Sequence, residues 1–128
     1  MFYLGIDFGT SGARAVVIDE HQTIQTQLDY PFTRKDQQPQ QWQEALFALL
    51  QEIPIALREN IQKIAINGTS STVLLCDQTG TPLTEPLLYS DRAPDDIVQT
   101  LPDIAPADHV VQSASSSLAK RLWWQQQP

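Results

Sequence analysis

The sequence predicts an α/β fold built around a mixed β-sheet. Residues 2–8, 13–19 and 24–32 are apolar or alternating segments separated by short polar turns, as in neighbouring strands. Because such turns join antiparallel strands, these three segments should form an antiparallel meander. An amphipathic helix and another apolar strand follow. This strand–helix–strand order favours a crossover that places the last strand parallel to the first.

The stretch QQWQEALFALLQEI at residues 40–53 predicts the helix. Its large apolar residues recur at helical spacing and give one apolar face, formed by Trp42, Leu46, Leu49, Leu50 and Ile53. Pro54 should end the helix because proline lacks an amide hydrogen, and residues 55–59 should add a short helical turn. Residues 62–67, QKIAIN, then predict the strand that pairs with the first one.

The second half of the chain predicts an extra hairpin followed by short helices. VLLCD (73–77) and PLTEPLLYS (82–90) are expected as strands around the turn QTGT, with Cys76 as a small core residue. Beyond residue 91, prolines at 94, 102 and 106 divide the chain into short pieces. The segment SSLAKRLWWQQQ (116–127) predicts a last amphipathic helix with a serine N-cap.

The composition favours a protein that handles a small molecule. Of 128 residues, 8 are Lys or Arg and 15 are Asp or Glu, which gives a formal net charge of −7. No basic stripe suits nucleic-acid phosphates, and no apolar run could span a bilayer, so we expect neither partner. The single cysteine, Cys76, cannot form a disulfide within the chain. Since no basic leader precedes the first strand, we expect a cytoplasmic protein.

The turn GTSG at residues 9–12 follows Asp7 closely and invites several interpretations. It is no dinucleotide-binding fingerprint, because a strand follows it, and it lacks the GK[ST] ending of a Walker A loop. An ordinary hairpin with a polar tip stays open. So does a metal-dependent nuclease in which Asp7 joins a helix acid, Glu44 or Glu52, although residues 67–68 offer no third carboxylate.

A phosphate-binding hairpin is the interpretation that uses every residue of this turn. Backbone amides in a tight turn form a small anion-binding concavity, and the two glycines permit positive φ and a close approach of phosphate. Thr10 and Ser11 add hydroxyl donors. Asp7 would hold Mg²⁺ through its water shell, because magnesium gives up water reluctantly.

Four stretches together resemble a known family. GIDFGTSGARAVVID resembles the first phosphate motif of the actin-like ATPase superfamily, whose domains are ribonuclease H-like, and within it the FGGY family of carbohydrate kinases. Three further stretches resemble later blocks of that family and follow in the same order: QQPQQWQEAL, IAINGTSSTVLLCDQTGTPLTEPLLYSDRA and SSLAKRLWWQQQP. The resemblance implies a ribonuclease H-like α/β domain in which residues 1–128 are the N-terminal part of the first of two kinase domains.

The resemblance also implies roles for residues near the first turn. Asp7 would help to place magnesium. Contacts to the transferred phosphate would come from the turn and the residue after it, namely Gly9, Thr10, Ser11, Gly12 and Arg14. For Arg14, an exposed strand arginine without a ligand remains the alternative. No catalytic base is assigned, because in the family that residue lies beyond position 128.

For the sugar, the resemblance implies a pocket formed by Ser70, Ser71, Tyr89 and Asp91. The alternatives are a core aromatic for Tyr89 and a helix N-cap for Asp91. Glycerol kinases carry an Arg-Glu pair at the Ser70–Ser71 loop, and bacterial xylulokinases a Met-His pair. The short hydroxyls here leave more room and resemble the smaller ribulose- and xylulose-type kinases.

The expected activity is therefore ATP-dependent phosphorylation of a sugar hydroxyl, with ATP and Mg²⁺ as cofactors and D-ribulose or D-xylulose as the expected type of substrate. The segment alone should be inactive as a kinase. Two alternatives stay open: a hydrolysis-driven actin-like ATPase of the chaperone or filament type, and a non-enzymatic oligomerisation module. A homodimer is also left open.

Overall fold

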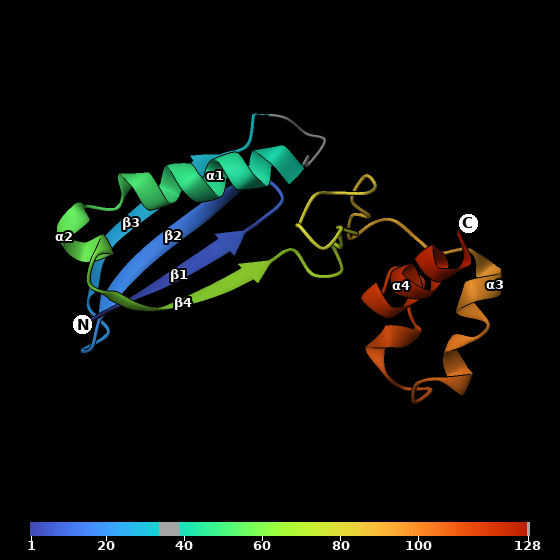
Figure 1. Cartoon of the computed structure of the whole chain (residues 1–128). Coiled ribbons are helices and arrows are strands. Elements are labelled where there is room, and N and C mark those ends of the chain that lie inside the picture. The colour runs from blue at the N-terminus through green and yellow to red at the C-terminus, as the bar shows by residue number, and fades with distance from the viewer. Residues whose placement is uncertain (34–38, 128) are drawn as a thin grey trace. The chain divides into compact units, whose positions relative to one another are not determined.

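The computed structural model describes residues 1–33 and 39–127, drawn in Figure 1. The chain divides into two compact units, Met1–Thr69 and Ser70–Pro128. The first unit holds the sheet and its covering helix, and the second holds a long irregular segment and a small helical cluster. In the described residues, no helix combines the length and the apolar character needed to cross a membrane.

A four-stranded mixed sheet forms the first unit. Its strands are β1 (Phe2–Phe8), β2 (Gly12–Asp19), β3 (Ile24–Pro31) and β4 (Ile61–Gly68), in the order β3-β2-β1-β4. The pairs β1–β2 and β2–β3 are antiparallel, and β4 lies parallel to β1. The predicted meander and the predicted parallel strand are therefore both confirmed.

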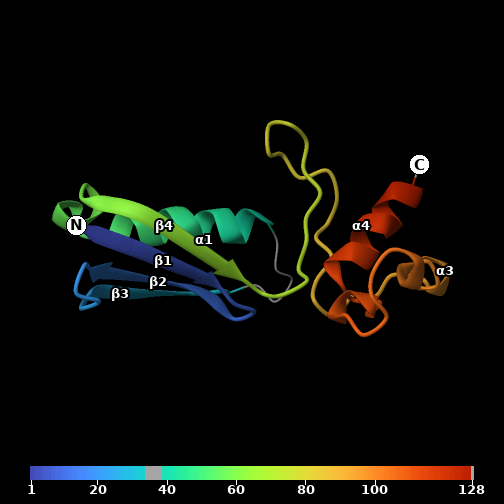
Figure 2. The same cartoon turned by 90° about the horizontal axis from the view of Figure 1, so that it is seen from below.

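Helix α1 (Pro39–Glu52) covers one face of this sheet, as Figures 1 and 2 show. The buried members of the hydrophobic core between them are Leu4, Ile6, Ala13, Ala15, Val17, Ala45, Leu49 and Ile53. Burying one such leucine or isoleucine side chain stabilises the fold by about 1.5–3 kcal/mol. Of the predicted apolar face, Leu49 and Ile53 are buried in this core and Leu46 and Leu50 pack against it, whereas Trp42 does not belong to it.

The end of α1 lies where the sequence predicts it. The helix stops at Glu52, and the short helix α2 (Ile55–Arg58) begins directly after Pro54. Arg58 Nη1 donates a hydrogen bond to the Leu50 carbonyl oxygen at 3.0 Å. That contact satisfies one of the carbonyls that every helix leaves unpaired in its last turn.

The opposite face of the sheet carries the side chain of Asp7. Side chains alternate between the two faces of a strand, so Asp7 points away from the face that carries its neighbours Ile6 and Phe8. Asp7, Arg14 and Asn67 line a groove of about 480 Å³ on that opposite face. Because Asp7 is the penultimate residue of β1, this groove opens beside the turn that follows the strand.

The predicted hairpin over residues 73–90 is present in the second unit as antiparallel pairing around the predicted turn, but its two continuous strands do not form. Only two isolated bridges occur there, Val73 with Leu87 and Cys76 with Pro82, and no strand forms in this stretch. The prolines at 82 and 86 lack amide hydrogens, so they interrupt any continuous ladder. The turn itself is present, with the Gly80 amide bonded to the Asp77 carbonyl oxygen. Cys76 is exposed rather than buried, because no continuous strand carries it into a core.

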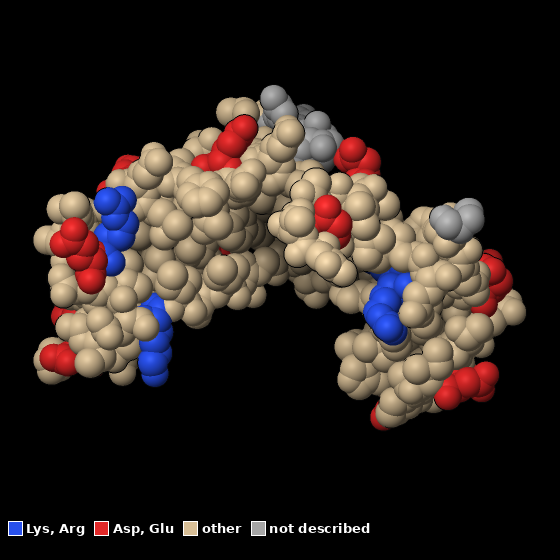
Figure 3. Space-filling model, in the orientation of Figure 1, with Lys and Arg blue, Asp and Glu red and all other residues tan. Residues whose placement is uncertain are grey.

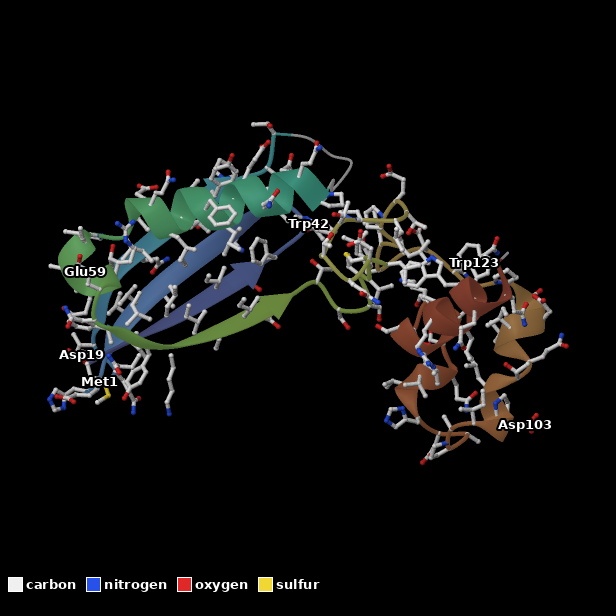
Figure 4. All side chains as sticks on the ribbon, viewed as in Figure 1. Met1, Asp19, Trp42, Glu59, Asp103 and Trp123 are labelled. Carbon is white, nitrogen blue, oxygen red and sulfur yellow. The ribbon has the colours of Figure 1, made fainter. Side chains whose placement is uncertain are left out.

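A helical cluster completes the second unit. It contains α3 (Asp95–Val98), η1 (Leu101–Asp103), η2 (Val110–Gln112) and α4 (Ser117–Gln126). The buried centre consists of Ala93, Ile97, Leu101 and Ala119. The predicted serine cap of α4 is confirmed at Ser116, whose Oγ accepts a hydrogen bond from the Ala119 amide at 3.1 Å. Figure 4 shows the labelled Trp123 on this helix.

Candidate functional site

Asp7 is held at the end of β1 by the neighbouring parallel strand. Asn67 stands opposite it in the β1–β4 register, and its Nδ2 donates a hydrogen bond to Asp7 Oδ1 at 2.8 Å. Arg14, opposite Asp7 on β2, brings Nη1 to 3.6 Å from Asp7 Oδ2. The side chain of Asp7 remains 43% exposed. The carboxylate is therefore oriented by two neighbours and still open to solvent.

Arg14 lies between two carboxylates. Its Nε is 3.3 Å from Asp29 Oδ1, and its Nη1 faces Asp7. The side chains of Arg14 and Asp29 are 53% and 63% exposed, so each ion pair contributes at most about 1 kcal/mol to stability. The pairs orient the guanidinium along the open face of the sheet more than they stabilise the fold.

The turn between β1 and β2 is closed by its own backbone. The Gly9 amide donates to the Gly12 carbonyl oxygen at 2.9 Å, and the Phe32 amide donates to the Ser11 carbonyl oxygen at 3.0 Å. Thr10 and Ser11 are exposed. Within residues 1–33 and 39–127, the structure records no acceptor for the amide of Thr10. A donor left free in a tight turn is the group that an anion requires.

The glycines of this turn are explained by space. Neither has a positive φ, and within the described residues the only positive-φ glycine is Gly80, so the turn does not use the left-handed conformation that its glycines permit. A Cβ at Gly12 would lie 2.6 Å from the Tyr30 carbonyl oxygen. Since real Cβ atoms do not approach backbone that closely, Gly12 is required by the neighbouring strand β3.

Asp7 also suits the outer coordination of a magnesium ion. A hard cation prefers oxygen ligands, and magnesium usually binds through one or two carboxylates, its own waters and substrate phosphates. Asp7 offers an exposed carboxylate with Oδ1 already bonded to Asn67. Among the residues that the structure describes, no three His, Cys, Asp or Glu side chains gather into a metal-binding group. The arrangement therefore fits a metal that shares its ligands with a phosphate.

The four predicted sugar residues, Ser70, Ser71, Tyr89 and Asp91, all lie in the second unit. Ser70 is exposed, and Ser71 has a left-handed backbone with φ of 61°, which is uncommon for a residue other than glycine. Thr69, in the first unit, donates from its hydroxyl to the Phe8 carbonyl oxygen at 3.2 Å. The hydroxyl of Thr72 is buried, with no partner among the described residues. Ser70 is thus the most accessible hydroxyl of this loop's second-unit part.

The structure excludes the alternative roles of Tyr89 and Asp91, a core aromatic and a helix N-cap. Tyr89 is 53% exposed, so it is no core aromatic. Asp91 does not cap a helix, because Pro94 precedes α3 and its own Oδ2 accepts a hydrogen bond from the Leu88 amide at 2.7 Å. Both residues belong to one tight turn, which the Asp91 amide closes onto the Leu88 carbonyl oxygen.

Two residues near these positions were missed by sequence reasoning. One is Asn67, for which the register opposite Asp7 was the available signal. The other is Lys120 on α4, whose ammonium donates a hydrogen bond to the Ser71 carbonyl oxygen. Ser71 belongs to the loop Ser70–Ser71, called the serine loop below. A lysine in an amphipathic helix normally predicts a solvent-exposed position, so the sequence offered no direct signal for it.

The sheet and the first turn agree with the predicted class of fold. A mixed sheet in the order β3-β2-β1-β4, with an acid near the end of β1 and a tight turn into β2, matches the actin-like ATPase fold that the sequence predicts. The model of the N-terminal domain of the FGGY family of carbohydrate kinases matches residues 2–120. The chain belongs to this family.

Solved structures agree on the fold. A xyloylose kinase from Brucella ovis has a TM-score of 0.78 at 24% identity, over 96% of this chain and 29% of that one. A glycerol kinase from Plasmodium falciparum with ADP has 0.71 at 20% identity, over 99% and 29%. A ligand-bound xylulose kinase from Lactobacillus acidophilus has 0.63 at 19% identity, over 98% and 28%. The chain thus spans less than a third of the length of these proteins.

Proposed function

We propose that this chain is the N-terminal part of an ATP-dependent sugar kinase and that it supplies the phosphate turn and part of the sugar pocket. Sugar kinases of the family use ATP. In the solved structures described above, the chain matches less than a third of the kinase, so the remaining parts of the site would come from elsewhere in a longer protein. The transferase activity is proposed for that complete protein.

The observation that carries this proposal is the orientation of Asp7. Its Oδ1 is fixed by Asn67, Arg14 lies beside its Oδ2, and the turn at residues 9–12 follows within two residues. Phosphoryl transfer depends mainly on alignment and on neutralising charge around the transferred group. An oriented acid next to free turn donors and a cation is suited to that work.

Each group near the turn has a distinct part in the proposed reaction. The amide of Thr10 and the hydroxyls of Thr10 and Ser11 bind phosphate oxygens. Gly9 and Gly12 let the phosphate approach the backbone closely, and Arg14 adds a positive charge. Asp7 orients the water shell of a magnesium ion. When bound, magnesium neutralises negative charge on the nucleotide phosphates. On the face shown in Figure 3, the Lys and Arg side chains, coloured blue, are few and scattered.

The proposed substrate is a ketopentose of the D-ribulose or D-xylulose type. The loop at Ser70 and Ser71 carries short hydroxyls, so it has no charged fork that would restrict the pocket to a small polyol. Tyr89 offers an exposed ring for the face of a sugar, and Asp91 offers an acceptor in the same turn. Two of the similar solved structures bear xylulose-type names, which supports this choice.

A substrate panel tests the proposal. The complete gene product is incubated with ATP, Mg²⁺ and a set of pentoses, pentuloses, pentitols and hexoses, and ADP release is measured. We expect sugar-stimulated ADP release that is largest with a ketopentose. Stimulation by no sugar would contradict the kinase assignment, and stimulation by glycerol or a hexose alone would contradict the ketopentose.

A pair of variants tests the role of Asp7. Asp7→Ala should lower kcat by about a hundredfold or more, since it removes a group that orients the metal, and should leave the KM for the sugar nearly unchanged. Asp29→Ala is the matched control, because Asp29 contacts the same arginine from the neighbouring strand. An Asp7→Ala enzyme with normal turnover would refute the metal role.

A further inference from the structure

A charged side chain lies fully buried in the second unit. Lys120, in the first turns of α4, has a relative exposure of 0%. Its Nζ donates a hydrogen bond to the Ser71 carbonyl oxygen at 2.6 Å and another to the Leu88 carbonyl oxygen. These two acceptors lie 17 residues apart in the sequence, and each is far from the lysine along the chain. One ammonium group thus joins three separate segments.

Burying this lysine is unfavourable unless its partners compensate. Removing an ammonium from water costs several kcal/mol, and charge-assisted hydrogen bonds recover only part of that. Burial lowers the pKa of Lys120 below its usual 10.5, and the negative charge of Asp91 opposes this shift. An apolar residue of similar volume would pack here without the desolvation cost. Packing alone therefore does not explain a lysine at this position.

The ammonium binds the backbone of Ser71, a proposed sugar residue, and of Leu88, which directly precedes another, Tyr89. Ser71 has the uncommon φ of 61°, a conformation that persists only where the surroundings enforce it. Leu88 lies one residue before Tyr89, and its amide is bonded to Asp91 Oδ2 at 2.7 Å. The lysine thus contacts the carbonyl side of a residue whose amide side is fixed by Asp91.

We propose that Lys120 is a positioning residue of the sugar site. It fixes the serine loop and the turn at residues 88–91 relative to each other, so that the side chains proposed to touch the sugar keep one arrangement. Those side chains are Ser70, Ser71, Tyr89 and Asp91. This inference rests on the proposed kinase function for its substrate, and on the hydrogen bonds alone for its geometry.

A pair of variants of the complete protein separates positioning from folding. Lys120→Met keeps the length of the side chain and removes the donors. Arg121→Met, at the exposed next position of α4, removes a cation without touching the loop. We expect Lys120→Met to raise the KM for the sugar about tenfold or more, because misplaced contacts weaken binding, while the KM for ATP changes less than about twofold. Arg121→Met should leave both constants unchanged.

The split between the two KM values is the decisive readout. A merely structural role would lower the amount of active enzyme and would leave both KM values alone. A Lys120→Met protein with the wild-type KM for the sugar, or with both constants raised equally, overturns the proposal. Should the methionine variant not fold, Lys120→Gln takes its place with the same expectation, since a neutral and shorter side chain cannot reach both carbonyls.

A measurement on the wild-type protein keeps this inference separate from the kinase proposal. Acylation of lysines followed by mass spectrometry should modify the exposed Lys63 and spare Lys120 in the folded protein. Modification of both at similar rates would overturn the buried contact. Suppose that Lys120 is spared but no sugar stimulates ADP release. The hydrogen bonds of Lys120 are then confirmed, whereas the proposed kinase function and the proposed role of Lys120 in the sugar site are both refuted.

Discussion

Asn67 Nδ2 donates a hydrogen bond to Asp7 Oδ1 across 2.8 Å, and the two residues stand opposite each other on the parallel strands β4 and β1. A parallel strand reaches this position only through the crossover formed by α1 and α2. The orientation of an acid at residue 7 therefore depends on a residue 60 positions further along the chain. Residues from the two ends of the first unit thus meet at the proposed magnesium site.

Removing this amide should impair turnover more than binding. In Asn67→Ala, Asp7 loses its oriented neighbour and samples other rotamers, so kcat should fall about tenfold while the KM for the sugar stays within about twofold. Steady-state kinetics on the complete protein measures both. Asn60→Ala is the control, because the Asn60 side chain also donates a hydrogen bond, to the Ala56 carbonyl oxygen, and Asn60 directly precedes β4, whereas Asn67 lies near the other end of that strand. An unchanged kcat in Asn67→Ala would show that the hydrogen bond has no functional role.

Gly12→Ala should destabilise the protein. The added Cβ would lie 2.6 Å from the Tyr30 carbonyl oxygen, so β2 and β3 would have to separate locally, at a cost of about 1–3 kcal/mol. Gly68→Ala is the matched control, since a Cβ there meets nothing within 4 Å. Urea unfolding of the two variants measures the difference in free energy of unfolding. Equal values would contradict the steric explanation for Gly12.

The packing of α1 on the sheet can be tested with two residues of the same helix. Leu49 is 1% exposed, so Leu49→Ala should lower the free energy of unfolding by about 2–5 kcal/mol. Phe47, two positions earlier, is 53% exposed, and Phe47→Ala should change it by no more than about 0.5 kcal/mol. Thermal or urea unfolding of the two variants measures both changes in the free energy of unfolding. A larger loss in the phenylalanine variant would mean that the helix packs through a different face.

The turn that begins at Asp77 should give a pH-dependent contribution to stability. The Asp77 carboxylate accepts hydrogen bonds from the Thr79 hydroxyl and from the Thr81 and Thr79 amides, which lower its pKa below the usual 3.8. A lowered carboxyl pKa stabilises the folded state above pH 3.8, and this contribution disappears as the pH falls through the folded-state pKa.

Asp77→Asn should therefore be less stable than the wild type above pH 3.8, and the gap should close at lower pH. Unfolding curves across this range provide the measurement. Asp19, whose pKa is also lowered, first by the Thr23 amide, should behave in the same way in Asp19→Asn. A gap that widens as the pH falls would contradict the sign of the proposed linkage.

The first unit could be predicted from the sequence because its signals are local. Alternation in residues 2–31 identified three strands, and the spacing of Leu46, Leu49 and Ile53 identified the helix face. Pro54 ends that helix as expected. The parallel placement of β4 followed from the general preference for right-handed crossovers. In each case the physical cause lies within a few residues of the pattern that it produces.

The second unit was harder to predict because its structure depends on distant contacts. The apolar run at residues 73–77 has the composition of a strand, yet prolines 82 and 86 deny it a continuous partner. Lys120 was missed because its acceptors are carbonyl groups, which every residue possesses and no sequence pattern identifies. The roles of Ser70, Tyr89 and Asp91 remain predictions that the sugar kinetics will decide.

The close contact between Gly12 and Tyr30 has a practical consequence for redesign. The shape of the first turn is determined partly by the backbone of β3, through the Tyr30 carbonyl oxygen and the hydrogen bond from the Phe32 amide to Ser11. The strand β3 thus helps to set the shape of the turn that we propose to bind phosphate. A mutant library meant to alter phosphate-donor choice should keep positions 30–32 constant and diversify Thr10 and Ser11, whose side chains are exposed.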